Sequence, residues 1–548
     1  MRARKLSIAA DPAAQDAMLA GLLRPQTYPH PVTKVEHLQT HISHVFLAGD
    51  YAYKLKKPVN LGFLDFTTLD KRERACADEV RLNARLAPEI YLGVVTLCIA
   101  NGSYRVAEEG CVPREIILDY AVRMRRMPQE GMLDRLAATA QLTADHVLDI
   151  ARQMALFHTN AEHHRDLDRY AQLDSIAAPI RQNFQQMQHY IDTCLPRARF
   201  ERLCDYSENF LREHAGLFQE RIRRGRIVDG HGDLHLGNMC LFNDRVVIFD
   251  CIEFNPALRA GDAINDIAFL TMDLTERKLP QLAGAFLNEY LQLTGDYHGL
   301  ALLDFYQVYR ACVRGKVNAF QSDGAVDAAA RERARQSARD YFALAEQLLN
   351  PRRGGVLITC GLSGSGKTTV ARQASARLDG ILIRSDIVRK QLAGMAALQR
   401  DSVGYGEGIY NQPMSERTYA TLLDQASDII AAGRWAIIDA TFSTRARRDA
   451  VAALAGKHQV PYVILHCIAP RAELVRRLSA RAADNRDASD ATAALLEQQS
   501  RSFQLPVASE GQLHICAPDT PACLDGLEAL HALTPAGGAV RPRTHSHV

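Results

Sequence analysis

The sequence predicts two successive domains of different class, α+β in residues 31–349 and α/β in residues 356–534. Three observations predict this order. Short apolar runs broken by turn signals fill residues 45–117, and helical spacing of apolar residues dominates from residue 144 onward. After the Pro- and Gly-containing linker 350–355, strand-like runs alternate with helical stretches, which is typical of βαβ units around a parallel sheet.

Composition and charge restrict the class of protein before any motif is considered. Of the 548 residues, 47% are hydrophobic and 23% are charged, which is ordinary for a globular protein and excludes a mainly disordered chain. The net charge of +2 gives no general attraction to nucleic acid or to an anionic membrane. No apolar run reaches the roughly 18 residues of a membrane span, and the twelve cysteines include no C-x-x-C pair. We therefore expect a cytoplasmic protein with no membrane partner.

The first domain is predicted to follow a loosely ordered stretch, residues 1–30. The runs VFLAG, YAYKL, YLGVVTLCI and EIILDYAVRM predict a small, mostly antiparallel sheet, and one helix interrupts them at about 71–86. Helices are predicted over 144–223. Two short strands then flank a loop rich in Gly, His and Asp within 227–250, and helices return until about Leu349.

The loop HGDLHLGN, residues 231–238, is the first candidate for chemistry. It places Asn238 five residues after Asp233, and the strand RVVIFD that follows ends in Asp250. A carboxylate can accept a hydroxyl proton, and carboxylate and amide oxygens are ligands for Mg²⁺. The order predicts Asp233 as a catalytic base and Asn238 and Asp250 as Mg²⁺ ligands. The alternative is a polar turn with a chance Asp/Asn pair.

A lysine and a glutamate upstream fit the same chemistry. YAYKLKKP places Lys54 on a strand, and Glu79 lies on the helix that follows; such a pair orients the phosphates of ATP in kinase-like lobes. Lys56 lies on the same strand face and is an alternative, and a solvated basic strand is another. No G-x-G-x-x-G motif precedes Lys54, and the hairpin before it has the single glycine Gly49. The phosphate cover must therefore differ from that of protein kinases or be weak.

The segments HGDLHLGN, IFDCIEFN and AINDIAFLTMDL resemble the aminoglycoside phosphotransferase-like branch of the protein-kinase-like fold. THISHVFLAGDYAYKLKKPVNLGFLDF and RLNARLAPEIYLGV resemble a bacterial subgroup of that branch, in which the domain is often fused to a P-loop kinase. This resemblance implies a bilobal domain that binds ATP and Mg²⁺. It describes a fold and not a drug substrate.

In the second domain GLSGSGKTT, residues 361–369, fits G-x-x-x-x-G-K-[ST] between a predicted strand and a predicted helix. Backbone N–H groups of such a loop point at phosphate oxygens, its lysine contacts the β- and γ-phosphates, and the next hydroxyl ligates Mg²⁺. The predicted ATP-binding residues are Gly361, Ser363, Gly364, Ser365, Gly366, Lys367, Thr368 and Thr369, and Thr368 is also a predicted Mg²⁺ ligand.

Four later polar residues are further candidates in this domain. Asp386 follows the second strand as the base for an acceptor hydroxyl, as the N-cap of the next helix, or as both. Asp439 ends another strand and would hold Mg²⁺, unless it is a plain strand-terminal residue. Arg477 and Arg481 share a helix face and would be catalytic arginines that neutralise charge on the transferred phosphoryl group. A solvated basic face is the alternative.

The segments GLSGSGKTT, RSDIVRKQL, AIIDATF and RLSAR resemble the P-loop small-molecule and polynucleotide kinases. The resemblance is closest to predicted kinases related to zeta toxins, gluconate kinases and phage polynucleotide kinase. It implies a P-loop NTPase domain with Asp386 as base and Arg477 and Arg481 as lid arginines. The tail 535–548, rich in Pro, Gly, Arg and His, is predicted to be disordered.

The two halves together predict an ATP-dependent phosphotransferase with two nucleotide sites, which transfers the γ-phosphate to hydroxyl groups of small molecules. Arg310 and Arg314 share one helix face, and a basic face suits an anionic acceptor, with a solvated face as the alternative. A second hypothesis is a nucleotide-binding switch in which one half, the N-terminal one first, does not transfer phosphate. A nucleic-acid end kinase ranks low, because no basic and aromatic strip accompanies the single tryptophan, Trp435.

Overall fold

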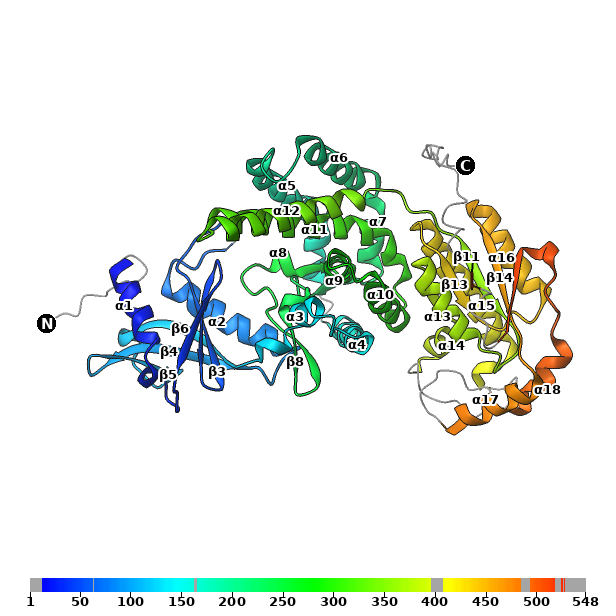
Figure 1. Cartoon of the computed structure of the whole chain (residues 1–548), viewed down its shortest axis with the longest axis horizontal. Coiled ribbons are helices and arrows are strands. Elements are labelled where there is room, and N and C mark those ends of the chain that lie inside the picture. The colour runs from blue at the N-terminus through cyan, green and yellow to red at the C-terminus, as the bar shows by residue number, and fades with distance from the viewer. Residues whose placement is uncertain are drawn as a thin grey trace. The chain divides into compact units, whose positions relative to one another are not determined.

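A computed structural model describes residues 12–62, 64–161, 165–395, 408–483, 493–517, 524–525 and 527. The chain divides into two compact units (Figure 1), which are described here separately. Unit 1 comprises Met1–Ala283 and Leu303–Leu349, and unit 2 comprises Gly284–Leu302 and Asn350–Val548. The segment Gly284–Leu302, which we expected in the first domain, therefore belongs to unit 2. The tail predicted to be disordered, 535–548, lies outside the described residues.

The first part of unit 1 is a six-stranded sheet whose neighbouring strands are all antiparallel, in the order β1-β2-β3-β6-β4-β5. Its strands are β1 Val35–Gln39, β2 Ser43–Ala48, β3 Tyr51–Lys56, β4 Tyr91–Ala100, β5 Ser103–Glu108 and β6 Ile117–Arg125. Helix α2, Leu69–Asn83, packs on β4 and β6. The predicted antiparallel sheet with one helix is thus confirmed.

Helix α2 is fixed at its start and on its buried face. The hydroxyl of Thr68 accepts the N–H of Lys71, which satisfies one of the free donors of the first turn. One turn later the buried guanidinium of Arg72 donates from Nε to Asp119 of β6 at 2.8 Å. This pair holds the helix against the sheet, so that Glu79, two turns further on, also faces inward.

The N-terminus of unit 1 differs from the expectation of a loosely ordered stretch. Residues Pro12–Leu22 form helix α1, and Met18 and Leu22 are buried in one cluster with Phe46 and Tyr53 of the sheet. The order comes from this packing, because α1 itself has no charged residue in its first or last turn to stabilise it.

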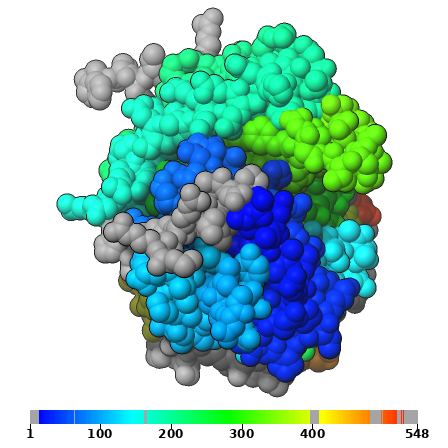
Figure 2. Space-filling view, turned by 90° about the vertical axis from the view of Figure 1, so that its left-hand side faces the viewer, coloured from blue at the N-terminus to red at the C-terminus, as the bar shows by residue number. Residues whose placement is uncertain are grey.

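The rest of unit 1 is mainly helical. Its helices are α3 Leu133–Ala138, α4 Ala144–Asn160, α5 Leu173–Met187, α6 Arg197–Glu213, α7 Ala215–Arg223, α8 Pro256–Arg259, α9 Ala263–Glu276, α11 Leu300–Asp323 and α12 Ala328–Gln347. Two strand pairs are β7 Ile227–Asp229 with β10 Ala260–Asp262, and β8 Met239–Phe242 with β9 Arg245–Ile248. The loop 231–238 runs between β7 and β8. Figure 2 shows the sheet, in blue, and the helices α5 and α6, in teal, on one side of unit 1.

Unit 2 contains a five-stranded sheet in which all strands are parallel, in the order β12-β13-β11-β14-β15. Its strands are β11 Val356–Cys360, β12 Ile381–Arg384, β13 Ala436–Asp439, β14 Tyr462–Cys467 and β15 Gln512–Cys516. Its helices are α13 Lys367–Leu378, α14 Ser385–Leu392, α15 Gln412–Ala431, α16 Arg445–His458, α17 Arg471–Ala483 and α18 Ala493–Ser502. The predicted parallel sheet is confirmed, and the loops after β11, β12 and β13 meet at its carboxyl edge. In the part of the chain that the structure describes, no helix is long and apolar enough to cross a membrane.

Helix α10, Pro280–Thr294, closes the outer edge of this sheet through one asparagine. Asn288 Oδ1 accepts the N–H of Leu382 at 2.6 Å, and Asn288 Nδ2 donates to the carbonyl of Gly380 at 3.1 Å. These are the backbone groups that a neighbouring strand would pair with, because β12 lies at the end of the strand order. One side chain of α10 therefore makes hydrogen bonds that a neighbouring strand would otherwise make on this edge.

Replacing Asn288 by alanine is expected to destabilise β12 by about 1–3 kcal/mol, since two backbone groups lose their partners. The measurement is hydrogen exchange of the Leu382 amide, which reports local opening of the edge strand. Asn318→Ala is the matched control, because Asn318 donates to the carbonyl four residues before it, as Asn288 does, but makes no hydrogen bond to a strand within the described residues. Equal protection of Leu382 in both variants would contradict the role given to Asn288.

Candidate active sites

The cluster in unit 1 begins with Lys54 on β3. Its Nζ donates to Glu79 of α2 at 2.8 Å and to Asp250, after β9, at 2.5 Å. Burial alone would lower the pKa of Lys54, but the two carboxylates raise it well above its usual value. The structure thus brings three predicted residues together, and Lys54 keeps its charge.

A second lysine lies behind the first. Lys56 is fully buried; it contacts Glu79 at 2.5 Å and also binds Glu253, three residues after Asp250. Burial would raise the pKa of Glu79, yet the two lysines lower it to about 2. Lys56 and Lys54 therefore share Glu79, and it is Lys54 that reaches Asp250. Sequence reasoning missed Glu253, although it stands within the quoted segment IFDCIEFN.

The predicted base and the first predicted metal ligand are in direct contact. Asn238 Nδ2 donates to Asp233 Oδ2 at 2.8 Å and to the Asp233 carbonyl at 3.0 Å. The Asn238 Oδ1 accepts no hydrogen bond within the described residues. The side chains of Asp233 and Asp250 are 37% and 38% exposed. Both carboxylates are therefore accessible to solvent, although their partners His235 and Lys54 are more deeply buried.

The Asp250 carboxylate is aimed by an uncommon backbone conformation. Its φ is 63°, in the left-handed region that Asp tolerates better than most residues. Its N–H donates to the hydroxyl of Tyr91 at 3.1 Å, and the preceding Phe249 N–H donates to the carbonyl of Asn238 at 3.0 Å. The second bond ties the segment of Asp250 to the segment of Asn238.

A buried aspartate on α9 holds the loop that carries Asp233. Asp266 accepts the N–H of His231 at 2.7 Å and that of Gly232 at 2.8 Å, and it also contacts His158 of α4. Sequence reasoning gave Asp266 no role, although it lies in the quoted segment AINDIAFLTMDL. The signal was weak because its partners are more than 30 residues away.

Replacing Asp266 by asparagine is expected to lower the stability of unit 1 at pH 7 by about 2 kcal/mol. Burial would raise the pKa of Asp266, but contacts with His158 and His231 lower it to about 2. A carboxyl with a lowered pKa stabilises the fold above its unfolded pKa, and this stability is lost as the pH falls toward 2. Urea unfolding at several pH values should show the difference between wild type and variant shrinking below about pH 4. A difference that is constant with pH would contradict the assignment.

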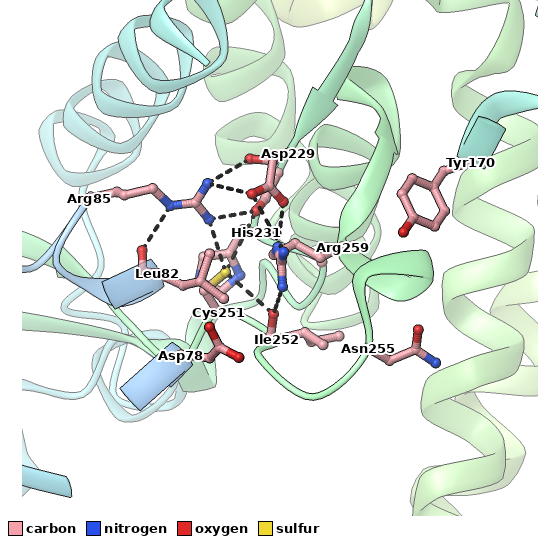
Figure 3. Close-up of polar contacts among 12 residues, drawn as sticks. Asp78, Leu82, Arg85, Tyr170, Asp229, His231, Cys251, Ile252, Asn255 and Arg259 are labelled. Carbon is pink, nitrogen blue, oxygen red and sulfur yellow. Dashed lines mark hydrogen bonds and ion pairs between the residues drawn. The ribbon is translucent and has the colours of Figure 1, made fainter. Parts of the chain in front are cut away.

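Two arginines fix the strand that leads into the loop 231–238 (Figure 3). Arg85, just after α2, donates to the Asp229 carbonyl at 2.9 Å and to the Gly230 carbonyl at 3.1 Å. Arg259 of α8 binds the Asp229 carboxylate and donates to the Ile252 carbonyl at 2.7 Å. The strand-rich part of unit 1 is thereby joined to the loop 231–238, and no sequence motif indicated this cluster.

In unit 2 the predicted phosphate loop lies between β11 and α13. Gly361, Gly364 and Gly366 have φ values of 145°, 84° and 91°, which side chains rarely allow. A Cβ on Gly361 would also lie 2.3 Å from the Cys467 carbonyl. Ser365 Oγ is buried and has no hydrogen-bond partner among the described residues. The loop is therefore shaped by glycines and keeps one unused hydroxyl.

Lys367 and Thr368 of this loop lie close to Asp439. Lys367 Nζ donates to the Leu362 carbonyl at 2.8 Å; burial lowers its pKa, and Asp439 opposes that shift. Thr368 Oγ1 donates to Asp439 Oδ2 at 2.7 Å, so the two predicted Mg²⁺ ligands of unit 2 are in contact. The N–H of Ser363 donates to Gln499 of α18 at 3.1 Å, and Thr369 is exposed on α13.

The structure tests the predicted positions of Asp386 and the two predicted lid arginines to different degrees. Asp386 lies in the first turn of α14, whose N-cap is Arg384, so the alternative of Asp386 as N-cap is wrong. Its carboxylate is 26% exposed, and its charge acts on Lys367. Arg477 lies beside the loop, since its Nη1 is 3.3 Å from a Cβ built on Gly366. Arg481 belongs to α17, and its side chain lies outside what the structure describes.

Comparison with known proteins gives relatives over most of the chain. A protein of Mycobacterium bovis is 32% identical over 472 residues, which are 85% of this chain and 91% of the relative. The chain belongs to the family of that protein. Proteins from two strains of Mycobacterium tuberculosis match this chain with the same identity and coverage, and all three relatives are uncharacterized proteins.

Two further comparisons concern single units. A family model described as an AAA domain matches residues 356–506. Kti12 of Chaetomium thermophilum, solved with ADP-AlF3, is 18% identical and covers 33% of this chain and all of that chain (100%), with a TM-score of 0.26. A choline/ethanolamine kinase family protein from Mesorhizobium loti is 13% identical and covers 61% of this chain and 99% of that chain, with a TM-score of 0.33. The AAA-domain match and the parallel sheet agree with the P-loop NTPase domain predicted for unit 2, and the protein-kinase-like fold of unit 1 stays a prediction.

Proposed function

We propose that this protein is an ATP-dependent phosphotransferase of the cytoplasm with one nucleotide site in each unit. Each site would transfer the γ-phosphate of ATP to a hydroxyl group of a small molecule. The observation that carries the proposal is the cluster in unit 1, where Lys54 meets Glu79 and Asp250 beside the contact of Asn238 with Asp233. These residues come from four separate segments of the chain.

The residues of unit 1 fit Mg²⁺ and ATP by the chemistry of their donors. Asp250 and Asn238 Oδ1 offer the hard oxygen atoms that Mg²⁺ prefers, and Lys54 offers a fixed positive charge. Mg·ATP, when bound, would supply the phosphoryl group and neutralise its charge. Asp233 would accept the proton of the acceptor hydroxyl while that oxygen bonds to the γ-phosphorus and the bond to the β-phosphate oxygen breaks, leaving ADP.

The residues of unit 2 also fit Mg²⁺ and ATP, with a different set of donors. The unused Ser365 hydroxyl and the N–H groups of the glycine-shaped loop would bind phosphate oxygens, and Lys367 would move from the Leu362 carbonyl onto them. Thr368 and Asp439 would hold Mg²⁺. Asp386 would accept the acceptor proton, and Arg477 would neutralise charge on the phosphoryl group, with Arg481 one turn further along α17.

The test is transfer of labelled γ-phosphate from Mg·ATP to a small-metabolite extract. Wild type and variants inactivated in one unit or the other are compared, and each labelled product is assigned to the unit whose loss removes it. Two products, one lost when unit 1 is inactivated and the other lost when unit 2 is inactivated, support two active sites. Binding of ATP without any product from several extracts would contradict the proposal.

One observation favours a different role for unit 1, that of a nucleotide-binding switch. The hairpin between β1 and β2, which would cover the phosphates, has no glycine, and Thr40 closes it by accepting the N–H of Ser43 at 3.0 Å. Lys57 also donates to the Thr40 carbonyl at 2.6 Å. Mg²⁺-dependent ATP binding to unit 1 that is unchanged by loss of Asp233, with no product, would support the switch.

A further inference from the structure

The two arginines of α11 differ in what surrounds them. Arg314 is engaged at the catalytic loop: its Nη1 is 3.4 Å from His235 Nε2, and its guanidinium lies 5.5 Å from the Tyr341 ring centroid. The Asp273 carboxylate also acts on its charge. Arg314 thus has an imidazole, an aromatic ring and a carboxylate around it within the fold.

The contacts of Arg310, one turn earlier, are with neutral groups. Arg310 is 5% exposed, and its Nε donates to the Asn265 Oδ1 at 2.9 Å. Its remaining contacts are with the ring faces of Phe269 and Tyr309, and no carboxylate pairs with it within the described residues. Buried guanidinium groups are normally paired with an anion, because an unpaired buried charge is costly. Arg310 therefore calls for a negative group from outside the chain.

The space for such a group lies next to Arg310. A cavity of about 40 Å³ is formed by α5, α8, β10, the start of α9 and α11, and Arg310, Asn265, Tyr306 and Tyr309 line it. The hydroxyls of both tyrosines make no hydrogen bond in the part of the chain that the structure describes, and Tyr306 is 3% exposed. One water needs roughly 10–15 Å³ by the same measure, so the cavity has the size of a carboxylate or phosphate group.

A carboxylate in the cavity wall does not oppose an anion. Asp262 also lines the cavity, but Arg221 binds it through two nitrogens, each at 2.7 Å. Asp262 further accepts the N–H of Ile264 as the N-cap of α9. Its charge is thereby compensated inside the fold, and the net charge facing the cavity is that of Arg310.

The cavity is adjacent to the catalytic loop. Leu258 lines it, and the Leu258 carbonyl lies 2.8 Å from a Cβ built on Gly232, the residue before Asp233. Asn265, which holds Arg310, precedes the Asp266 that fixes the loop. Since α11 rises about 6 Å in the four residues from Arg310 to Arg314, a small molecule can span both places.

We propose that the acceptor of unit 1 is a small molecule with an anionic group, a carboxylate or a phosphate ester. This group would bind Arg310 and the Tyr306 and Tyr309 hydroxyls, and the hydroxyl to be phosphorylated would face Asp233. The inference rests on the proposed phosphotransferase activity of unit 1 and narrows its substrate class. It excludes polycationic acceptors, which Arg310 would repel.

The first test separates acceptors by charge. A metabolite extract is passed over an anion exchanger at neutral pH, and the retained and unretained fractions are each incubated with γ-labelled Mg·ATP and the full chain. Products that Asp233→Asn removes belong to unit 1. We expect them from the retained fraction. Such a product from the unretained fraction alone overturns the inference and leaves the proposed function intact, whereas no such product from either fraction counts against the function itself.

The second test assigns the anion to Arg310. With the retained fraction as acceptor, Arg310→Met is expected to raise the acceptor KM about 10- to 100-fold while the KM for ATP stays unchanged. Arg310→Lys should recover part of the loss, and Arg333→Met, an exposed arginine on α12, is the matched control. A purely structural Arg310 would instead change the KM for ATP and the thermal midpoint together, and an unchanged acceptor KM overturns the proposal.

A third measurement needs no variant, in case Arg310→Met does not fold. Inorganic phosphate and succinate are added separately to wild type. Competition against the acceptor and not against ATP is expected from one of them, and the stronger inhibitor indicates whether the natural group is a phosphate or a carboxylate. Failure of both to compete overturns the anion site.

Discussion

Replacement of Asp233 by asparagine is expected to lower the rate of phosphoryl transfer by unit 1 about 10²- to 10⁴-fold, the usual contribution of a general base. Asparagine keeps the shape of the side chain and can still contact Asn238, but it cannot accept the hydroxyl proton. Burial would raise the pKa of Asp233, yet His235 and Arg314 hold it well below its usual value. The base is therefore ionised at neutral pH, and its loss should appear in kcat more than in the KM for ATP.

The matched control for this prediction is Asp244→Asn in the turn between β8 and β9. Asp244 is exposed and has a φ of 60°, a conformation that asparagine also adopts, so the same chemical change is made without touching the loop. Labelled-phosphate transfer is measured for both variants together with ATP affinity. Loss of ATP binding in Asp233→Asn, in place of loss of turnover, would contradict the role of a base.

Replacement of Lys367 by methionine is expected to lower transfer by unit 2 about 10²- to 10³-fold, as loss of one charged donor at a reacting phosphate does elsewhere. Methionine fills the space of the lysine stem, so the loop between β11 and α13 keeps its packing. The substitution removes the positive charge of the Lys367 ammonium group, which lies against the backbone of the loop. The product assigned to unit 2 should fall, and the product assigned to unit 1 should remain.

Lys457→Met on α16 controls for the loss of one positive charge from unit 2, because Lys457 is exposed. Thermal melting with and without Mg·ATP supplies a second readout, since ligand binding raises the midpoint by mass action. Stabilisation by ATP should be reduced in Lys367→Met and retained in Lys457→Met. Equal transfer by both variants would remove Lys367 from the proposed site.

Local motifs predicted the site residues that lie close together in the sequence. Asp233 and Asn238 are five residues apart, and the loop 361–369 is continuous, so spacing alone identified them as candidates. Alternating strands and helices likewise predicted the parallel sheet of unit 2. Lys54, Glu79 and Asp250 needed the resemblance to a known fold as well, because 196 residues separate the first from the last.

The contacts that sequence reasoning missed are tertiary contacts, which no local pattern records. Lys56 and Glu253 are 197 residues apart, and Arg310 is 45 residues from Asn265. The spacing of Arg310 and Arg314 showed a shared helix face, but not that Arg314 has partners and Arg310 faces a cavity. The order of α1 came from its packing on the sheet, which its own composition does not indicate.

The assignment of Gly284–Leu302 to unit 2 has a consequence for how the protein can be divided. The chain passes from one unit to the other three times, at 283–284, 302–303 and 349–350. A protease nick at 350–355 would therefore not release an intact second unit, because Asn288 and its neighbours would stay on the other fragment. The two pieces should remain associated through the edge of β12. Expressed separately, residues 1–349 and 350–548 should behave as a split protein that regains its second activity by complementation when mixed.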